Sequence, residues 1–425
     1  MKKKTCSILL GIMLAATSLL SACGSATGSS ATAATTSTSA ASDAASSEGT
    51  AVAGTGIAAE NLKVGVIYVG DENEGYTESH MAGIDAMQAA LGLTDDQVIE
   101  KTNIPEDETC YDAAVDLASQ GCNAIFATSF GHEDYLLQAA NEYPDIQFFH
   151  ATGYQAASSG LSNFHNYFTK IYEARYVSGV VAGLKLNEMI ESGKITEDKA
   201  KIGYVGAFPY AEVISGFTSF YLGAKSVCPS ATMEVQYTNS WADMSAENEV
   251  ATSLISNGAV LISQHADTTG APSACEAAGV PCVGYNVDMT SVAPSVALTS
   301  AANNWGAYYT IAGQSLVDGT EIPVDYAEGY DKNCVNITPL NEKAVAEGTA
   351  DKVAEVEAAL ADGSLHVFDT TTFTVGGKTL EDLIAEGGDY AKYADYVSDG
   401  YFHESEVGSA PAFDIIIDGV TAQAQ

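Results

Sequence analysis

The chain contains very little positive charge. Of its 425 residues only 17 are lysine or arginine, against 55 aspartates and glutamates, and the formal net charge is −38. Arg175 is the single arginine. A strongly acidic surface repels phosphate backbones and anionic lipid headgroups. The composition therefore excludes nucleic-acid binding.

Long hydrophobic runs and metal-binding cysteine motifs are missing after residue 60. No stretch there reaches the length of about 20 apolar residues that crosses a membrane, which excludes a transmembrane channel. No two cysteines have the C-x-x-C spacing, so we expect no redox motif, no metal and no cofactor. We interpret six cysteines as buried apolar side chains: Cys110, Cys122, Cys228, Cys275, Cys282 and Cys334.

The first 60 residues have the pattern of an export signal followed by a tether. Three lysines at 2–4 precede an apolar run at 8–20, and Leu20-Ser21-Ala22-Cys23 matches the bacterial lipobox. We expect a signal peptide over residues 1–22 and a lipid on the sulfur of Cys23. Residues 23–60 are rich in Ser, Thr, Ala and Gly, which predicts a flexible tether. The expected location is the cell membrane, lipid-anchored and facing outward. An uncleaved membrane anchor is the alternative.

Beyond residue 60, strand-like apolar runs alternate with helix-like stretches. Strands are predicted at 64–69, 124–127, 146–150, 201–207, 233–238, 259–263, 281–285 and 298–301. Helices are predicted between most of them, beginning with 77–91, and a further one at 305–318. Such alternation is typical of parallel sheets covered by helices on both faces, here in two α/β lobes. The end of the chain is predicted to hold a helix at 352–361 and hairpin-like pieces at 367–379.

Aromatic, amide and carboxylate side chains follow nearly every predicted strand. Open parallel sheets bind ligands at the carboxyl ends of their strands, so these residues are expected to line a cleft between the lobes. Aromatic walls with a few placed polar groups are typical of small-molecule sites. The candidate ligand-binding residues are Asp71, Asn73, Tyr76, Ser129, Phe130, Phe208, Trp241, Asp267, Asp288 and Trp305. The competing interpretation is structural, with Trp241 and Trp305 in packing and Asp267 and Asp288 as helix caps.

The segment GDENEGYT at residues 70–77 has the skeleton of a phosphate-binding loop but lacks its chemistry. Such a loop uses bare backbone N–H groups and a lysine to meet phosphate charge. Here Tyr76 stands where the lysine belongs, and Asp71, Glu72 and Glu74 would repel phosphate. The loop therefore suits a neutral ligand with hydroxyls or ring nitrogens. An acidic surface turn before a helix is the alternative.

Several longer segments resemble the basic membrane protein family, the substrate-binding lipoproteins of ABC transporters that are similar to purine nucleoside receptors. They include IFATSFGHEDYLLQAANEYPDIQFFHATGY, NYFTKIYEARYVSGVVAGLKL, KIGYVGAFPYAEVISGF, YTNSWADMSAENEVATSLISNGAVLISQHADT, GYNVDM and NNWGAYY. The resemblance runs from about residue 62 to 320, with the segments in family order.

The resemblance implies a type I periplasmic-binding fold, with two doubly wound parallel-sheet lobes joined by a three-strand hinge. Lobe 1 would comprise residues 61–168 and 300–328, and lobe 2 residues 169–299 and 329–425. It further implies a purine nucleoside or purine base in the interlobe cleft, with ABC permease subunits as partners. Tyr76, Phe130 and Trp241 match the aromatic positions that sandwich the base. Asp267 and Asp288 match the acidic positions that fix the ribose or the ring nitrogens.

Two departures from the family pattern leave the ligand open. The first loop carries Tyr76 where many relatives have tryptophan, and NNWGAYY lacks the lysine of the nucleoside-binding members, so a free base is as credible as a nucleoside. A sugar or other small-metabolite receptor stays an alternative, because sugar sites also combine rings with Asp and Asn. A nucleoside hydrolase-type enzyme is disfavoured, since no G-x-S-x-G motif and no D-x-D after the first strand occur. No catalytic residue is therefore expected.

Overall fold

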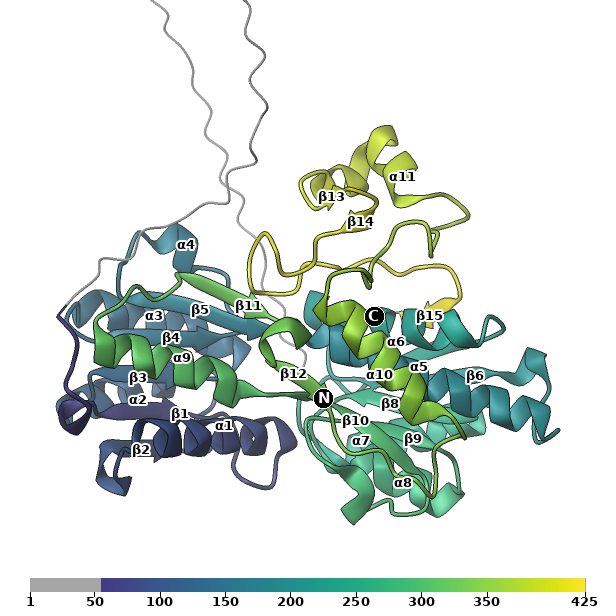
Figure 1. Ribbon diagram of the computed structural model, residues 1–425, viewed down its shortest axis with the longest axis horizontal. Helices are drawn as coiled ribbons and strands as arrows, with labels where there is room; N and C mark the ends of the chain where they lie inside the picture. Colours follow the sequence, from purple (N-terminus) through teal and green to yellow (C-terminus); the bar gives the residue numbers. More distant parts are fainter. Residues whose placement is uncertain (1–54, 425) are drawn as a thin grey trace, which may run out of the picture. The chain divides into compact units, whose positions relative to one another are not determined.

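Two parallel β-sheets organise the chain. The computed structural model, shown in Figure 1, describes residues 55–424. The first sheet has the strand order β11-β5-β4-β3-β1-β2 and is parallel throughout. Its strands are β1 (Val64–Ile67), β2 (Val98–Lys101), β3 (Ala124–Ala127), β4 (Gln147–Ala151), β5 (Phe164–Thr169) and β11 (Asp325–Glu328).

The second sheet has the order β12-β10-β9-β8-β6-β7-β15 and is parallel except for the antiparallel edge strand β12. Its strands are β6 (Lys201–Gly206), β7 (Thr232–Tyr237), β8 (Leu261–His265), β9 (Cys282–Tyr285), β10 (Ala297–Asn303), β12 (Val335–Ile337) and β15 (Val420–Ala422). The central strands β1, β3, β8 and β9 are fully buried, as expected for strands with helices on both faces.

Helices cover both faces of each sheet, so that each lobe has three layers. In the first lobe, α1 (Gly75–Leu91) and α9 (Trp305–Asp318) pack over one core, and α2 (Glu108–Ser119) and α3 (Glu133–Glu142) over the other. In the second, α5 (Ile171–Glu191) and α6 (Ala211–Val227) face α7 (Met244–Ser256) and α8 (Gly270–Ala278) across the sheet. The predicted helices at 77–91 and 305–318 are confirmed as α1 and α9.

The chain passes between the two sheets three times. It leaves β5 for α5 and β6, returns from β10 to α9, and leaves β11 for β12. These segments form a hinge of three connections. The arrangement confirms the predicted class of two doubly wound parallel-sheet lobes. The strands β2, β5, β11, β12 and β15, all of them at or beside sheet edges, were not predicted from the sequence.

The C-terminal part departs from the prediction in one place. The helix predicted at 352–361 is confirmed as α10 (Thr349–Ala361). The hairpin-like pieces predicted at 367–379 are present only as isolated antiparallel bridges, Val375–Lys378 within the segment and Asp369–Tyr401 to a later residue. The hairpin forms later, from β13 (Val397–Ser398) and β14 (Tyr401–Phe402), where Asp399 and Gly400 take positive φ angles that suit a tight turn. The short helices α4 (Ala156–Ser159) and α11 (Leu380–Glu386) complete the fold.

The expectations for the N-terminus mostly lie outside the described residues. These are the signal peptide at 1–22, the lipidated Cys23 and all but the last residues of the tether at 23–60. Within residues 55–424, no helix is both long and apolar enough to span a membrane. The six cysteines named above are free and buried, which confirms their predicted role as apolar side chains.

Helices α5 and α6 approach each other through glycines. A Cβ on Gly179 would collide with the backbone carbonyl oxygen of Phe220, and a Cβ on Gly223 with that of Tyr176. Because these obstacles are backbone atoms, a rotamer change cannot relieve them. The glycines therefore set the distance between the two helices that cover the sheet of the second lobe.

We expect Gly179→Ala to destabilise the protein. In an exposed helix this change stabilises by about 0.5–1 kcal/mol, because alanine loses less backbone entropy than glycine. Here the added methyl overpacks the contact, which costs about 1–3 kcal/mol. The free energy of unfolding from urea titration measures the change. Asp85→Glu, which adds one methylene on the exposed side of α1, is the control, and equal or greater stability of Gly179→Ala contradicts the close approach.

Candidate functional site

A cavity of about 320 Å³ lies where strands of both sheets end. The residues around it follow the carboxyl ends of β1, β3 and β4 in the first sheet and of β6, β7, β8 and β9 in the second. This is the place at which open parallel sheets bind ligands. The lining consists of Val69, Gly70, Glu74, Tyr76, Ser129, Phe130, Thr152, Phe208, Glu212, Asn239, Ser240, Trp241, Ala242, His265, Asp267 and Tyr285.

Six of the ten predicted site residues line this cavity. They are Tyr76, Ser129, Phe130, Phe208, Trp241 and Asp267. Three of them come from the first lobe and three from the second, as the strand-end argument predicts. Their contact with a ligand stays a prediction.

The other four predicted residues lie elsewhere. Asp71 accepts hydrogen bonds from the backbone and side-chain nitrogens of Asn73, both at 3.0 Å, at the surface of the first loop. Asp288 caps the short helix that follows β9, accepting from the Thr290 N–H at 2.8 Å. Trp305 is 1% exposed and packs in the core of the first lobe. In this structure Asp71 and Asp288 therefore make local hydrogen bonds and Trp305 packs in a core, as the structural interpretation predicts.

The first loop directs a carboxylate and a phenol inward. Glu74 is the N-cap of α1 and accepts from the backbone N–H groups of Tyr76 at 2.7 Å and Thr77 at 3.0 Å. Burial raises the pKa of Glu74, and these hydrogen bonds oppose the rise. The Tyr76 hydroxyl donates to the Thr128 carbonyl at 2.8 Å, which fixes its ring under the cavity.

The two lobes touch through this same loop. The Gly75 N–H donates to the Asp267 carbonyl at 2.9 Å, a hydrogen bond between the loop after β1 and the loop after β8. A Cβ on Gly75 would lie 3.3 Å from that oxygen, so glycine permits the approach. The structure therefore has the lobes in contact beside the cavity.

Asp267 is linked to the hinge by a chain of side-chain hydrogen bonds. Thr169, at the end of β5, donates to Asn303 at 2.5 Å, and Asn303 donates to Asn286 at 3.0 Å. Asn286 then donates to the Asp267 carboxylate at 3.3 Å. The position of this carboxylate thus depends on two of the segments that join the lobes.

A single guanidinium lies behind the lining. Arg175 is fully buried, lies over the ring of Tyr285 at 3.7 Å, and donates to the Gln264 carbonyl and the Tyr204 hydroxyl. Burial raises the pKa of Asp267 well above its ordinary range, nearby carboxylates raise it further, and Arg175 opposes the rise. The cavity therefore has an excess of acidic groups over the one buried cation.

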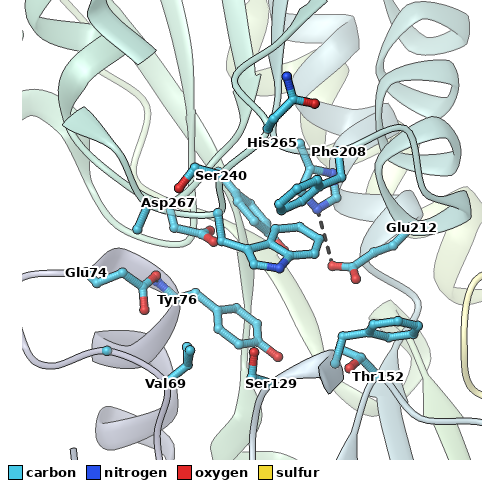
Figure 2. Close-up of a pocket in the computed structure, with 16 residues that line it drawn as sticks. Val69, Glu74, Tyr76, Ser129, Thr152, Phe208, Glu212, Ser240, His265 and Asp267 are labelled. Carbon is cyan, nitrogen blue, oxygen red and sulfur yellow. Dashed lines mark hydrogen bonds and ion pairs between the residues drawn. The ribbon is translucent and has the colours of Figure 1, made fainter. Parts of the chain in front are cut away.

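Glu212 lies across the cavity from Asp267 and Glu74 (Figure 2). Its carboxylate lies 3.3 Å from His265 Nε2. Burial and the charge of Arg175 lower the pKa of His265 well below its ordinary value, so the contact is a hydrogen bond from a neutral imidazole rather than an ion pair. Burial raises the pKa of Glu212 to about 7, which makes it a donor or an acceptor near neutral pH.

Aromatic rings form the remaining wall. Phe208 meets Trp241 edge-on, with centroids 5.2 Å apart, and stacks on Tyr210 at 5.0 Å. The Trp241 carbonyl accepts from the Asp267 N–H at 2.9 Å, which ties the ring-bearing loop to the carboxylate. Flat ligands can stack in such an arrangement while their edges meet the polar groups.

Sequence reasoning did not select several lining residues. Glu74 was noted only as a group that repels phosphate, and His265 was weighed only as a catalytic or metal-binding side chain. Tyr285 is the last residue of β9, and Glu212 is the second residue of α6. Their position at a strand end or on the first helical turn was the available signal, but it does not tell which way a side chain points.

Comparison with known proteins identifies relatives that bind small molecules. The sequence model of the Bmp family, described as ABC transporter substrate-binding protein PnrA-like, matches residues 61–360. A purine-binding protein of Brucella abortus is 33% identical over 315 residues, covering 73% of this chain and 84% of the relative. A candidate ABC transporter glucose-binding protein of Haloferax volcanii is 33% identical over 266 residues, covering 62% of this chain and 63% of the relative.

The fold is shared with a solved ABC transporter solute-binding protein from Conexibacter woesei. The TM-score is 0.59 at 22% identity, and the match covers 72% of this chain and 98% of the solved one. At this identity the likeness concerns the fold alone. It confirms the predicted type I periplasmic-binding fold.

Replacing Glu212 with glutamine is expected to change how stability depends on pH. The pKa of Glu212 is raised to about 7 from an ordinary value of 4.5. The folded protein therefore holds this proton more tightly than the unfolded chain does. The stability that results is fully present below the unfolded pKa and is lost as the pH rises through the folded one. Glu212→Gln cannot ionise, so its stability relative to the wild type should increase from about pH 5 to about pH 8.

Melting temperatures of both proteins across this pH range measure the effect. The control is Glu249→Gln, on the exposed side of α7. A difference between wild type and Glu212→Gln that stays constant with pH contradicts the raised pKa of Glu212.

Proposed function

Because this chain belongs to the Bmp family of PnrA-like ABC transporter substrate-binding proteins, we propose that it captures a purine nucleoside or a purine base in the interlobe cleft for import. The predicted family membership is confirmed. The family consists of extracytoplasmic solute receptors rather than enzymes. Within that role the ligand, the lipid anchor on Cys23 and delivery to permease subunits are parts of the proposal.

The observation that carries the proposal is the pairing of an aromatic wall with buried carboxylates. Phe208 and Trp241 provide apolar surface, and Glu74, Asp267 and Glu212 surround the same space. A purine offers flat faces for stacking and ring nitrogens and N–H groups at its edge. Stacking gives affinity to any base, and hydrogen bonds at the edge select among bases.

The protonation of the carboxyl groups suits a neutral heterocycle. A carboxyl whose pKa is raised can keep its proton and donate to a ring nitrogen, or release it and accept from an N–H or hydroxyl group. No lysine or arginine is among the residues that line the described cavity. A phosphate group would meet carboxylates without a facing cation, so nucleotides are disfavoured.

The relatives support this ligand class with one alternative. The Brucella abortus protein is named as purine-binding, and it shares one third of its aligned residues with this chain. The Haloferax volcanii relative is named as a candidate glucose-binding protein at the same identity, and carboxylates beside aromatic rings also suit a sugar. A sugar or other small-metabolite receptor is therefore the second candidate.

We propose capture by closure of the two lobes. A ligand that stacks on Trp241 would be covered when the first loop brings Tyr76 and Glu74 over it, with the Gly75–Asp267 hydrogen bond formed in the closed state. Hinged closure of this kind changes the surface that the lobes present together, which gives a permease a way to distinguish loaded from empty receptor.

Calorimetric titration of the full-length chain tests the function. The protein is first unfolded and refolded to remove any carried-over ligand, and is then titrated with adenosine, guanosine, inosine, adenine, ribose and glucose. Micromolar or tighter binding of a purine with silent sugars supports a purine receptor, and the comparison of base with nucleoside defines its class. Binding of glucose or ribose alone overturns the purine assignment.

We expect Trp241→Ala to weaken purine binding at least about tenfold, because stacking of a base on an aromatic ring contributes about 1–3 kcal/mol. The half-buried indole lies at the edge of the core, so the melting temperature should change little. Trp241→Phe retains a ring and serves as the matched control, with most of the affinity preserved. Unchanged affinity of Trp241→Ala removes this side chain from the site.

A further inference from the structure

A second, wider chamber adjoins the cavity. Its volume is about 860 Å³, and it shares Phe130, Thr152 and Glu212 with the lining of the cavity. One wall belongs to the first lobe near α4, one to the start of α6, and one to the C-terminal segment. The aromatic and aliphatic side chains that face it include Phe130, Tyr154, Tyr210, Tyr393, Tyr396 and Val407.

Exposed apolar side chains gather at this chamber. Seven large hydrophobic side chains are exposed within residues 55–424, and four of them line it. These four are Phe130, Tyr154, Tyr210 and Val407, with exposed fractions of 41%, 63%, 45% and 56%. Single exposed apolar residues are ordinary, but a cluster of them in a hollow indicates a surface that binds something apolar.

The aromatic rings continue from the chamber into the cavity. The ring centroids of Tyr154 and Phe130 are 6.4 Å apart, and those of Phe130 and Tyr210 are 6.0 Å apart. Tyr210 in turn stacks on Phe208, which contacts Trp241. A ligand held at Trp241 can therefore extend along aromatic surface into the chamber, past Thr152 and Glu212 at the junction.

The charged side chains of the chamber already have partners in the protein. The Asp325 carboxylate accepts from the Ser409 N–H with both oxygens at 3.1 Å, and Lys392 pairs with Asp414 at 2.7 Å. One carboxylate oxygen of Glu212 is bonded to His265. The apolar side chains, in contrast, still face open space, so burying them on ligand binding is the larger available gain in free energy.

The C-terminal wall of the chamber lies beyond the part of the chain that the family model matches. The family model ends at residue 360, whereas the wall runs through Lys392 and residues 407–412. In Figure 1 the segment after β14 reaches β11 of the first lobe, where the Ser409–Asp325 hydrogen bonds hold it. The C-terminal segment thus forms one side of the chamber, and residues beside the cleft form the other sides.

We propose that the chamber is an outer subsite that takes an uncharged aromatic or aliphatic substituent carried by the base in the cleft. This inference rests on the proposed function, because the base anchors the ligand. The receptor would then accept purines with an apolar group on the exocyclic nitrogen, such as a benzyl group. A ribose would bury less apolar surface in the chamber than such a group, and the exposed side chains there are large hydrophobic ones.

Titration of the wild-type full-length chain with adenine and with N6-benzyladenine tests the subsite. We expect the benzyl compound to bind at least as tightly as adenine. Tyr154→Ser and Val407→Ser should each weaken N6-benzyladenine about five- to tenfold, since each removes an apolar wall. Both should leave adenine affinity unchanged. Ile311→Ser, which replaces an exposed aliphatic residue on α9 away from the chamber, is the matched control.

Equal losses for adenine and N6-benzyladenine, or rejection of the benzyl compound by the wild type, overturn the subsite while leaving the purine receptor intact. A second probe, 4-fluorobenzyl alcohol observed by fluorine NMR, examines the chamber without a purine. Line broadening by the wild type and by Ile311→Ser, but not by Tyr154→Ser, supports the subsite. Silence with every purine titrated, nucleosides included, overturns the proposed function, and an unbroadened fluorine line overturns the chamber on its own.

Discussion

The site depends on the burial of several carboxyl groups with one guanidinium behind them. Arg175 is the only arginine of the chain, and it is held by Gln264, Tyr204 and the ring of Tyr285 rather than by an acid. Removing carboxylates from water is costly unless they are paired or keep their protons. Contact between the lobes buries Asp267 and Glu212. Burial favours carboxyl groups that keep their protons or that bond to a ligand. A ligand that supplies hydrogen bonds at its edge satisfies these groups, whereas an anion adds charge of the wrong sign.

The hydrogen bonds that position Asp267 connect this electrostatic constraint to the movement of the lobes. Its carboxylate is reached from the hinge through Asn303 and Asn286, and its backbone carbonyl meets Gly75 of the opposite lobe. Asn286 has a φ of 62°, a left-handed conformation that asparagine tolerates better than most residues. Opening of the lobes would break the contact with Gly75 and rearrange the segment that carries Asn303. In the proposed closing movement, closure and the placement of the carboxylate would therefore be coupled.

The fold and the edge of the sheet that forms the site could be predicted from the sequence, because strand periodicity and strand-end positions are local patterns. The direction of each side chain could not. Asp71 and Tyr76 lie in the same loop, yet Asp71 bonds to Asn73 at the surface while Tyr76 lines the cavity. Trp305 begins a helix at the hinge as predicted, but its position against α1 places it in the core. These outcomes depend on packing between segments far apart in the chain, for which the sequence pattern carries no signal.

The central sheets and the C-terminal wall of the chamber contribute differently to stability and to recognition. A fold retained at 22% identity requires buried strands and the helices over them, and these positions tolerate apolar substitution. The segment past residue 360 contributes only the edge strand β15 to the two large sheets. In this chain the segment past residue 360 joins the core of the second lobe through Phe368 and Phe413, and then reaches the first lobe through Ser409. A segment anchored at both lobes can reshape the mouth of the cleft without altering the sheets that position Asp267 and Trp241, so it can change the ligand range independently of the proposed closing movement.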